Sequence, residues 1–201
     1  MCASPAPTPP AAAEAPVWFV QVPSTFEALA QQACRSVVGA ARQGGCRRVL
    51  VEASAPELDP ASDAYRFQEL IGFSHSLAIQ LLEVGLPKSS PHVKLLFASA
   101  ADATYAGASI LTTSCPVSVL GHPAAIGPRD GAFVVVGPAA TQRDQQPTAG
   151  AEAALRDLLQ RAGGRLVVVL NPRLGNSPVL AQGFETAYLM RPLSVGCNTR
   201  N

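Results

Sequence analysis

The chain has 201 residues, of which 14% are charged, and its formal net charge is +1. A chain of this length favours a single domain with a sizeable hydrophobic core. The low charge excludes the basic surface with which nucleic-acid binders displace phosphate counterions, and an aromatic content of 5% argues against base-stacking platforms.

The N-terminal segment, residues 1–16, is rich in Ala and Pro, and a segment of that composition cannot bury a core. We expect it to be disordered and residues 17–201 to form one α/β domain. The stretch PSTFEALAQQACRSVVGAARQGG, residues 23–45, predicts a helix with one apolar face. Ser24 and Glu27 have the spacing of a capping box at its start.

Strands and helices alternate along the rest of the chain. In chain order the pattern predicts a strand at 46–54, a helix at 62–83, a strand at 92–99, a helix at 100–109, strands at 116–121 and 131–138, a loop around 141–148, a helix at 149–164 and strands at 165–172 and 184–193. Several strands are continuous apolar runs, which indicates a sheet covered on both faces. We therefore expect a three-layer α/β fold, with a mainly parallel sheet, helices on both faces and right-handed crossovers.

The last predicted strand, residues 184–193, follows its predecessor by a link that lacks room for a good helix. It is therefore expected to run antiparallel to that predecessor if the two pair, although a place elsewhere on the sheet stays open. The apolar strand residues expected to be buried on the single sheet are Val49, Val51, Leu95, Phe97, Val134, Val136, Val167 and Val169.

Several kinds of chemistry are excluded by missing motifs. The five cysteines are scattered without a C-x-x-C pair, which favours a reduced compartment and argues against a zinc site. Neither a dinucleotide fingerprint, a phosphate loop nor a nucleophile elbow is present. From Leu95 to Leu120 the only charge is Asp102, but Pro116 and many small polar residues favour strand, helix, strand over a membrane span. We expect no metal, no cofactor and no catalytic residue.

Candidate binding residues follow from position alone, because ligands of open α/β sheets lie outside the carboxyl ends of the strands. The polar residues at predicted strand ends are Glu52, Ser99, Asp102, Asn171 and Arg173. Among them the guanidinium of Arg173 suits an anion contact. The alternative is that Glu52 caps a neighbouring turn and that Asn171 belongs to turn chemistry.

Several segments, taken in order, resemble a plastid and cyanobacterial family built on a domain of unknown function. The family includes a low-photosystem-II-accumulation factor and the C-terminal extension of a plastid adenylate kinase. The resemblance spans most of residues 23–193. Its motifs are a glutamate-alanine pair, a glycine-arginine-valine-glutamate run, an asparagine-proline strand end and a tyrosine strand closing on arginine-proline-leucine. In this sequence the first is Glu27 and Ala28, and the second is Gly45, Arg47 or Arg48, Val51 and Glu52. The third is Asn171 and Pro172, and the fourth is Tyr188, Arg191, Pro192 and Leu193.

The resemblance implies a non-catalytic protein of the chloroplast stroma that assists the assembly of photosynthetic complexes through contacts with plastid proteins. It implies no catalytic residue. The residues themselves predict no transmembrane segment, and peripheral contact with a membrane stays open. The alternative is a small-molecule or nucleotide-binding α/β domain with a cleft at the strand ends, which the doubly wound pattern and the fusion to a kinase favour. An uncharacterised hydrolase or transferase ranks last.

Overall fold

The computed structural model describes residues 23–60, 62–84, 91–110, 113–137, 150–172, 177–181 and 183–190. The segment expected to be disordered, 1–16, and the loop predicted around 141–148 lie outside these residues. The described elements are α1 (Phe26–Gln43), β1 (Arg48–Ala53), η1 (Pro56–Leu58), α2 (Phe67–Val84), β2 (His92–Phe97), α3 (Ala100–Ser109), β3 (Val117–Val119), η2 (Pro123–Ala125), β4 (Asp130–Val136), α4 (Ala151–Ala162), β5 (Leu166–Leu170), α5 (Pro178–Ala181) and β6 (Glu185–Met190).

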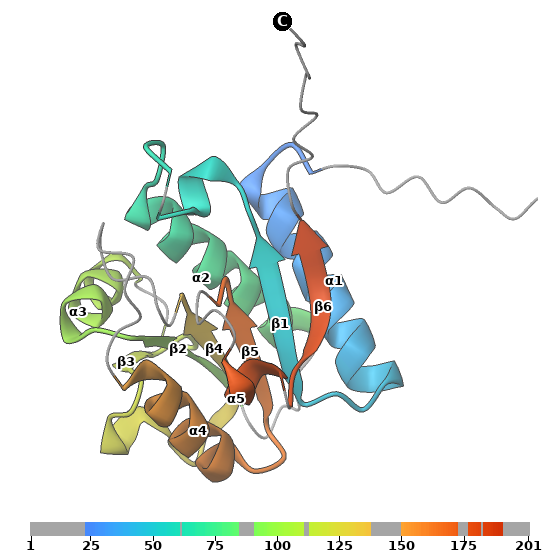
Figure 1. The fold of residues 1–201 in the computed structure, drawn as a ribbon, viewed down its shortest axis with the longest axis vertical. Helices are drawn as coiled ribbons and strands as arrows, with labels where there is room; N and C mark the ends of the chain where they lie inside the picture. Colours follow the sequence, from blue (N-terminus) through green and yellow to red (C-terminus); the bar gives the residue numbers. More distant parts are fainter. Residues whose placement is uncertain are drawn as a thin grey trace, which may run out of the picture.

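The strands form one six-stranded sheet in the order β3-β2-β4-β5-β1-β6, and every neighbouring pair is parallel. Helices cover both faces, as the sequence predicts. On the first face lie α1, α2 and α3, and on the second lie α4 and α5. In Figure 1, α1 passes behind β6 whereas α5 lies in front of the sheet.

The direction of winding reverses once. From β1 through α2 to β2, and on through α3 to β3, the chain moves toward one edge of the sheet with its helices on the first face. From β3 onward it moves toward the other edge, with η2, α4 and α5 on the second face. A single handedness of crossover requires this exchange of faces when the direction reverses.

The strand residues predicted to be buried are buried. Val49, Val51, Leu95, Phe97, Val134 and Val136 pack toward the first face, and Val167 and Val169 pack toward the second. Side chains along a strand alternate between the two faces, so continuous apolar runs are needed where both faces are covered. The expectation of a three-layer α/β fold is therefore confirmed.

The start of α1 differs from the capping box predicted at Ser24. The N-cap is Thr25, which has extended backbone angles and accepts a hydrogen bond from the Ala28 N–H at 3.1 Å. The helix begins at Phe26, one residue later than a Ser24 cap requires. Both hydroxyl side chains can cap a helix, so the choice between neighbouring positions depends on where Phe26 meets the core.

The expectation of an antiparallel last strand is wrong. The strand β6 does not pair with its predecessor β5 but lies beyond β1, and it runs parallel to β1 with Glu185 opposite Val49 and Met190 opposite Ala53. The connection from Asn171 to Phe184 contains the short helix α5 on the second face. This connection passes β1 and returns the chain to the edge where the parallel strands begin.

Candidate functional site

A crevice opens at the carboxyl edge of the sheet, the edge at which the parallel strands end. After β1 the chain leaves toward the first face, and after the neighbouring β5 it leaves toward the second. Such divergence leaves a gap between the two strand ends. The strand-end crevice encloses about 200 Å³ and is lined by Glu52, Ala53, Ser54, Leu58, Asp59, Asn171 and Pro172.

Asn171 forms one wall of the strand-end crevice by extending the pairing of β5 with β1. Its backbone N–H donates to the Val51 carbonyl at 2.8 Å. Its side-chain Oδ1 accepts from the Ala53 N–H at 2.7 Å, and its Nδ2 donates to the Ala53 carbonyl at 3.1 Å. The φ angle of Asn171 is +47°, a left-handed conformation that asparagine tolerates better than most residues. Asn171 therefore ends β5, and both of its side-chain bonds run to Ala53 of β1 rather than to the nearby backbone of a turn.

Glu52 lies in the same crevice. It is the penultimate residue of β1, stands opposite Leu189 of β6 and is half-buried. Asp59 brings a second carboxylate to the crevice. Both side chains also interact with other groups of the protein. The crevice thus combines acceptor oxygens with the methyl groups of Leu58. Arg173, the predicted anion contact, lies outside the described residues.

Ser99 and Asp102 do not join Glu52 and Asn171. They follow β2, which is separated from β1 by β4 and β5. At about 4.8 Å per strand, this places them roughly 14 Å away. Ser99 is the N-cap of α3, where its hydroxyl accepts from the Asp102 N–H at 3.0 Å. The structure thus brings together Glu52 and Asn171 and places Ser99 and Asp102 at a separate location.

Asp102 lines a second hollow of about 490 Å³ between the beginnings of α2 and α3. We call it the aromatic pocket, and its walls are Arg66, Phe67, Gln68, Ala101, Asp102 and Tyr105. The Phe67 ring meets the Tyr105 ring at 5.9 Å between centroids. Tyr105 is 45% exposed and, with Leu189, is one of the two large apolar side chains exposed in the described part of the chain.

Both rings of the aromatic pocket are held in place. Phe67 packs edge-on against the buried ring of Phe97, with 6.0 Å between centroids. The Tyr105 hydroxyl accepts a hydrogen bond from Gln68 Nε2 at 2.6 Å. The sequence prediction included Asp102 and missed Phe67 and Tyr105. The sequence feature that could have indicated this pocket was a tyrosine in a helix that otherwise consists of small residues, where a large exposed ring has no evident structural role.

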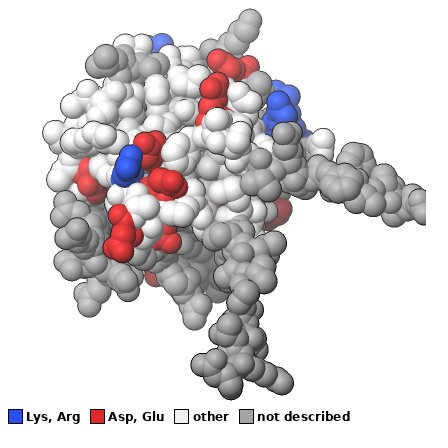
Figure 2. Space-filling model, turned by 90° about the horizontal axis from the view of Figure 1, so that it is seen from above, with Lys and Arg blue, Asp and Glu red and all other residues white. Residues whose placement is uncertain are grey.

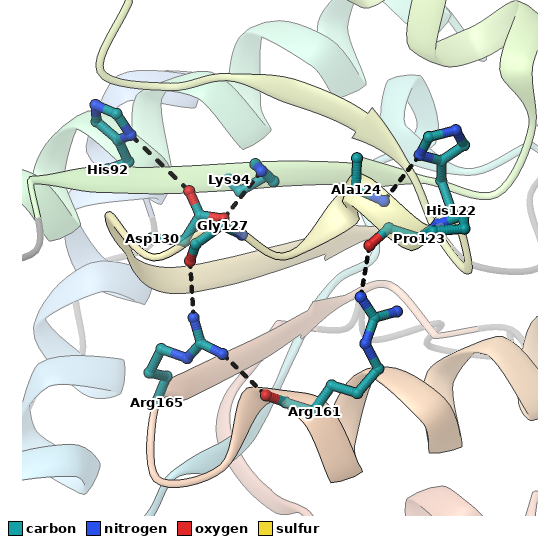
Figure 3. Close-up of polar contacts among 9 residues, drawn as sticks. All are labelled: His92, Lys94, His122, Pro123, Ala124, Gly127, Asp130, Arg161 and Arg165. Carbon is teal, nitrogen blue, oxygen red and sulfur yellow. Dashed lines mark hydrogen bonds and ion pairs between the residues drawn. The ribbon is translucent and has the colours of Figure 1, made fainter.

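A buried polar cluster lies at the opposite, amino edge of the sheet (Figure 3). Asp130 is 3% exposed, pairs with Lys94 Nζ at 2.9 Å and accepts from the Gly127 N–H at 2.6 Å. His92 Nδ1 lies 3.9 Å from the same carboxylate. Arg165 donates to the Gly127 carbonyl at 3.0 Å. These contacts stabilise the turn that leads into β4, so we assign the cluster a structural role.

Two further findings concern only the described ranges. They contain no group of three or more His, Cys, Asp or Glu side chains placed to hold a metal ion. Their helices include none with both the length and the apolar character that a membrane crossing requires.

The fold and its hollows define a parallel three-layer α/β domain with two recesses beside its carboxyl edge. A family model described as Domain of unknown function (DUF1995) matches residues 23–200, and the chain belongs to this family. This confirms the resemblance at the level of a domain-of-unknown-function family. No curated protein and no solved structure matched the chain.

Proposed function

We propose that this chain is a non-catalytic protein of the chloroplast stroma that acts as an accessory or assembly factor for photosynthetic complexes by binding other proteins. The resemblance of its motifs to a plastid family supports the location and the process. The observation that supports protein binding is the aromatic pocket, with Tyr105 half-exposed at its rim.

An aromatic pocket of this kind suits a protein partner. Aromatic side chains dominate the energetics of protein interfaces because they bury a large area with few rotatable bonds. Phe67 and Tyr105 are already oriented by Phe97 and Gln68, so little conformational entropy is lost when a partner docks. A volume of about 490 Å³ accommodates a large side chain of that partner.

The test is affinity purification of the full chain from chloroplasts, in parallel with Tyr105→Ala and Leu189→Ala. Leu189 is the matched control, because it is 52% exposed but belongs to β6, away from the aromatic pocket. We expect a defined set of stromal proteins to be lost with Tyr105→Ala and retained with Leu189→Ala. Identical protein sets from all three chains, or a location outside plastids, would contradict the proposal.

A second candidate function is the binding of a small molecule in the strand-end crevice. The divergence of the chain after β1 and β5 favours it. Its volume of about 200 Å³ is below the usual range of roughly 300–1,000 Å³ for ligand pockets, so only a small ligand fits. Mass spectrometry of molecules released from the purified protein, compared with a Glu52→Gln variant, tests this function. A ligand retained equally by both proteins would place binding elsewhere.

A further inference from the structure

We propose that the aromatic pocket binds a positively charged peptide segment of a partner protein, which packs one apolar side chain against Phe67 and Tyr105. This inference rests on the proposed function and adds the chemistry of the partner. It draws on two independent features, which are the shape of the pocket and the distribution of charge around it.

The apolar anchor follows from the pocket itself. Phe67 is half-buried and Tyr105 half-exposed, and their rings are tilted by 38° to each other. The two rings contact each other and form one apolar wall, against which the side chain of a leucine, methionine or phenylalanine can pack out of water. Because Phe97 and Gln68 hold the two rings, the pocket exists before the partner arrives.

The positive charge of the partner follows from the surroundings of the pocket. In parallel α/β folds the helices begin at the carboxyl edge, so the starts of α2 and α3 and the segment 54–66 after β1 lie at this end. Together they carry one basic residue, Arg66, and more acidic ones, which are Glu57, Asp59, Asp63, Glu69 and Asp102. Figure 2, which looks onto this end, shows several acidic groups gathered on part of it, with a basic group among them.

An anionic ligand is the main alternative, because the amino ends of α2 and α3 both lie beside the pocket and carry partial positive charge. However, Glu69 lies in the first turn of α2 and Asp102 in that of α3. These carboxylates offset the helix dipoles, and Asp102 lines the pocket itself. Salt screening at physiological ionic strength limits the reach of a charge to about 8–10 Å, so the carboxylates that count most are Glu69 and Asp102, at the starts of the two helices that form the pocket.

The experiment measures fluorescence anisotropy of labelled peptides with the full chain. The first peptide has one phenylalanine flanked by lysines, the second has glutamates in place of the lysines, and the third has serine in place of the phenylalanine. We expect only the first to bind well, and its affinity to fall as salt is raised. Tyr105→Ala is expected to weaken it about tenfold, the size of one interface anchor.

The charge contribution is tested with two double variants. Asp63→Asn with Asp102→Asn removes the carboxylate that lines the pocket and one in the segment that leads to Arg66, and we expect about a fivefold loss of affinity for the lysine peptide. Glu152→Gln with Asp157→Asn removes two carboxylates from α4, on the second face, and should leave that affinity unchanged.

The outcomes separate the two proposals. Tighter binding of the glutamate peptide, or equal losses from both double variants, overturns the inference of a basic partner. If Tyr105→Ala still removes stromal proteins in the purification, the proposed function stands despite that result. If the lysine peptide binds and Tyr105→Ala has no effect on it, the pocket is not the site.

Discussion

Among single residues, Asn171 has the clearest structural assignment. Its side chain makes with Ala53 the two hydrogen bonds that a further strand residue would make through its backbone. Its left-handed backbone then directs the chain out of the sheet. The geometry of the strand-end crevice therefore depends on one side-chain amide.

Substitution of Asn171 should lower the free energy of unfolding, and alanine should lower it more than glycine. Asn171→Ala loses both side-chain bonds and places at a φ of +47° a residue that tolerates the left-handed region less well than asparagine, so we expect a loss of about 3 kcal/mol. Asn171→Gly loses the same bonds without that strain, and a loss of about 1–2 kcal/mol is expected. Urea denaturation measures both. Equal stability of the two variants would show that the positive φ costs nothing here.

Lys94 and Asp130 form a buried ion pair whose two members depend on each other. Lys94→Met leaves the Asp130 carboxylate without its cation, and we expect a loss of about 3–5 kcal/mol in unfolding free energy. Adding Asp130→Asn to Lys94→Met should recover most of it, because the new side-chain amide can still accept from the Gly127 N–H without a buried charge. A double variant that is less stable than Lys94→Met would contradict this interpretation.

At the scale of elements, β5 and β6 differ in burial although they belong to one sheet. The strand β5 is buried along its whole length, whereas β6 lies at the edge with Glu185, Thr186 and Leu189 exposed. On its first face β6 is secured to α1, where the Tyr188 hydroxyl lies 3.1 Å from Gln32 Oε1. The two strands should therefore respond differently to the same substitution.

Val167→Asp should unfold the domain. Val167 belongs to β5 and is buried in the core of the second face, where an aspartate would have no positively charged partner. Thr186→Asp adds the same charge to the exposed β6 and should change the melting temperature by only a few degrees. Circular dichroism and thermal melting measure both effects. A Val167→Asp protein with the melting temperature of the parent would show that the burial of β5 is assigned wrongly.

Element type was predictable because its signals are local. The apolar periodicity of residues 23–45 and the apolar runs at 131–138 and 165–172 reflect which faces are buried. The position of β6 was not predictable in this way. Strand order depends on packing between segments far apart in the chain, and the short connection through α5 resembles a hairpin link in composition more than a crossover.

The residues of the candidate site were predictable only in part. Parallel strands end at one edge, so Glu52 and Asn171 could be expected there, and they line one crevice. Sequence could not show that β4 separates this crevice from β2 and from the Ser99 and Asp102 that follow it. The aromatic pocket joins Phe67 to Tyr105 across the gap between two helices, and no spacing along the chain encodes that contact.

At the scale of the whole molecule, two buried thiols can show whether the domain unfolds cooperatively. Burial raises the pKa of Cys34, in α1, to about 11, and burial raises the pKa of Cys115, beside β3, to about 11. Both thiols are therefore protected while the protein is folded. The helix α1 packs against β1 and β6, and β3 forms the other edge of the sheet, so the thiols probe opposite ends of the domain.

If residues 17–201 unfold as one domain, Cys34 and Cys115 should react with a thiol reagent with the same opening free energy. The measurement uses a chain in which Cys2, Cys46 and Cys197 are serine, with mass spectrometry to separate the two sites. Different opening free energies would indicate two independently unfolding parts. Because both thiols have raised pKa values in the folded state, stability should be complete below pH 9 and fall as the pH rises toward 11.

The position of β1 between β5 and β6 also constrains the synthesis of the protein. On a ribosome β1 emerges before both of its neighbours, which lie between Leu166 and Met190. Until those residues have emerged, the apolar side chains of β1 have no strand on either side, and unpaired strands readily associate with other chains. The growing polypeptide therefore exposes an aggregation-prone segment until residue 190 has been made, and we expect chaperones that act during synthesis to raise its yield of folded protein.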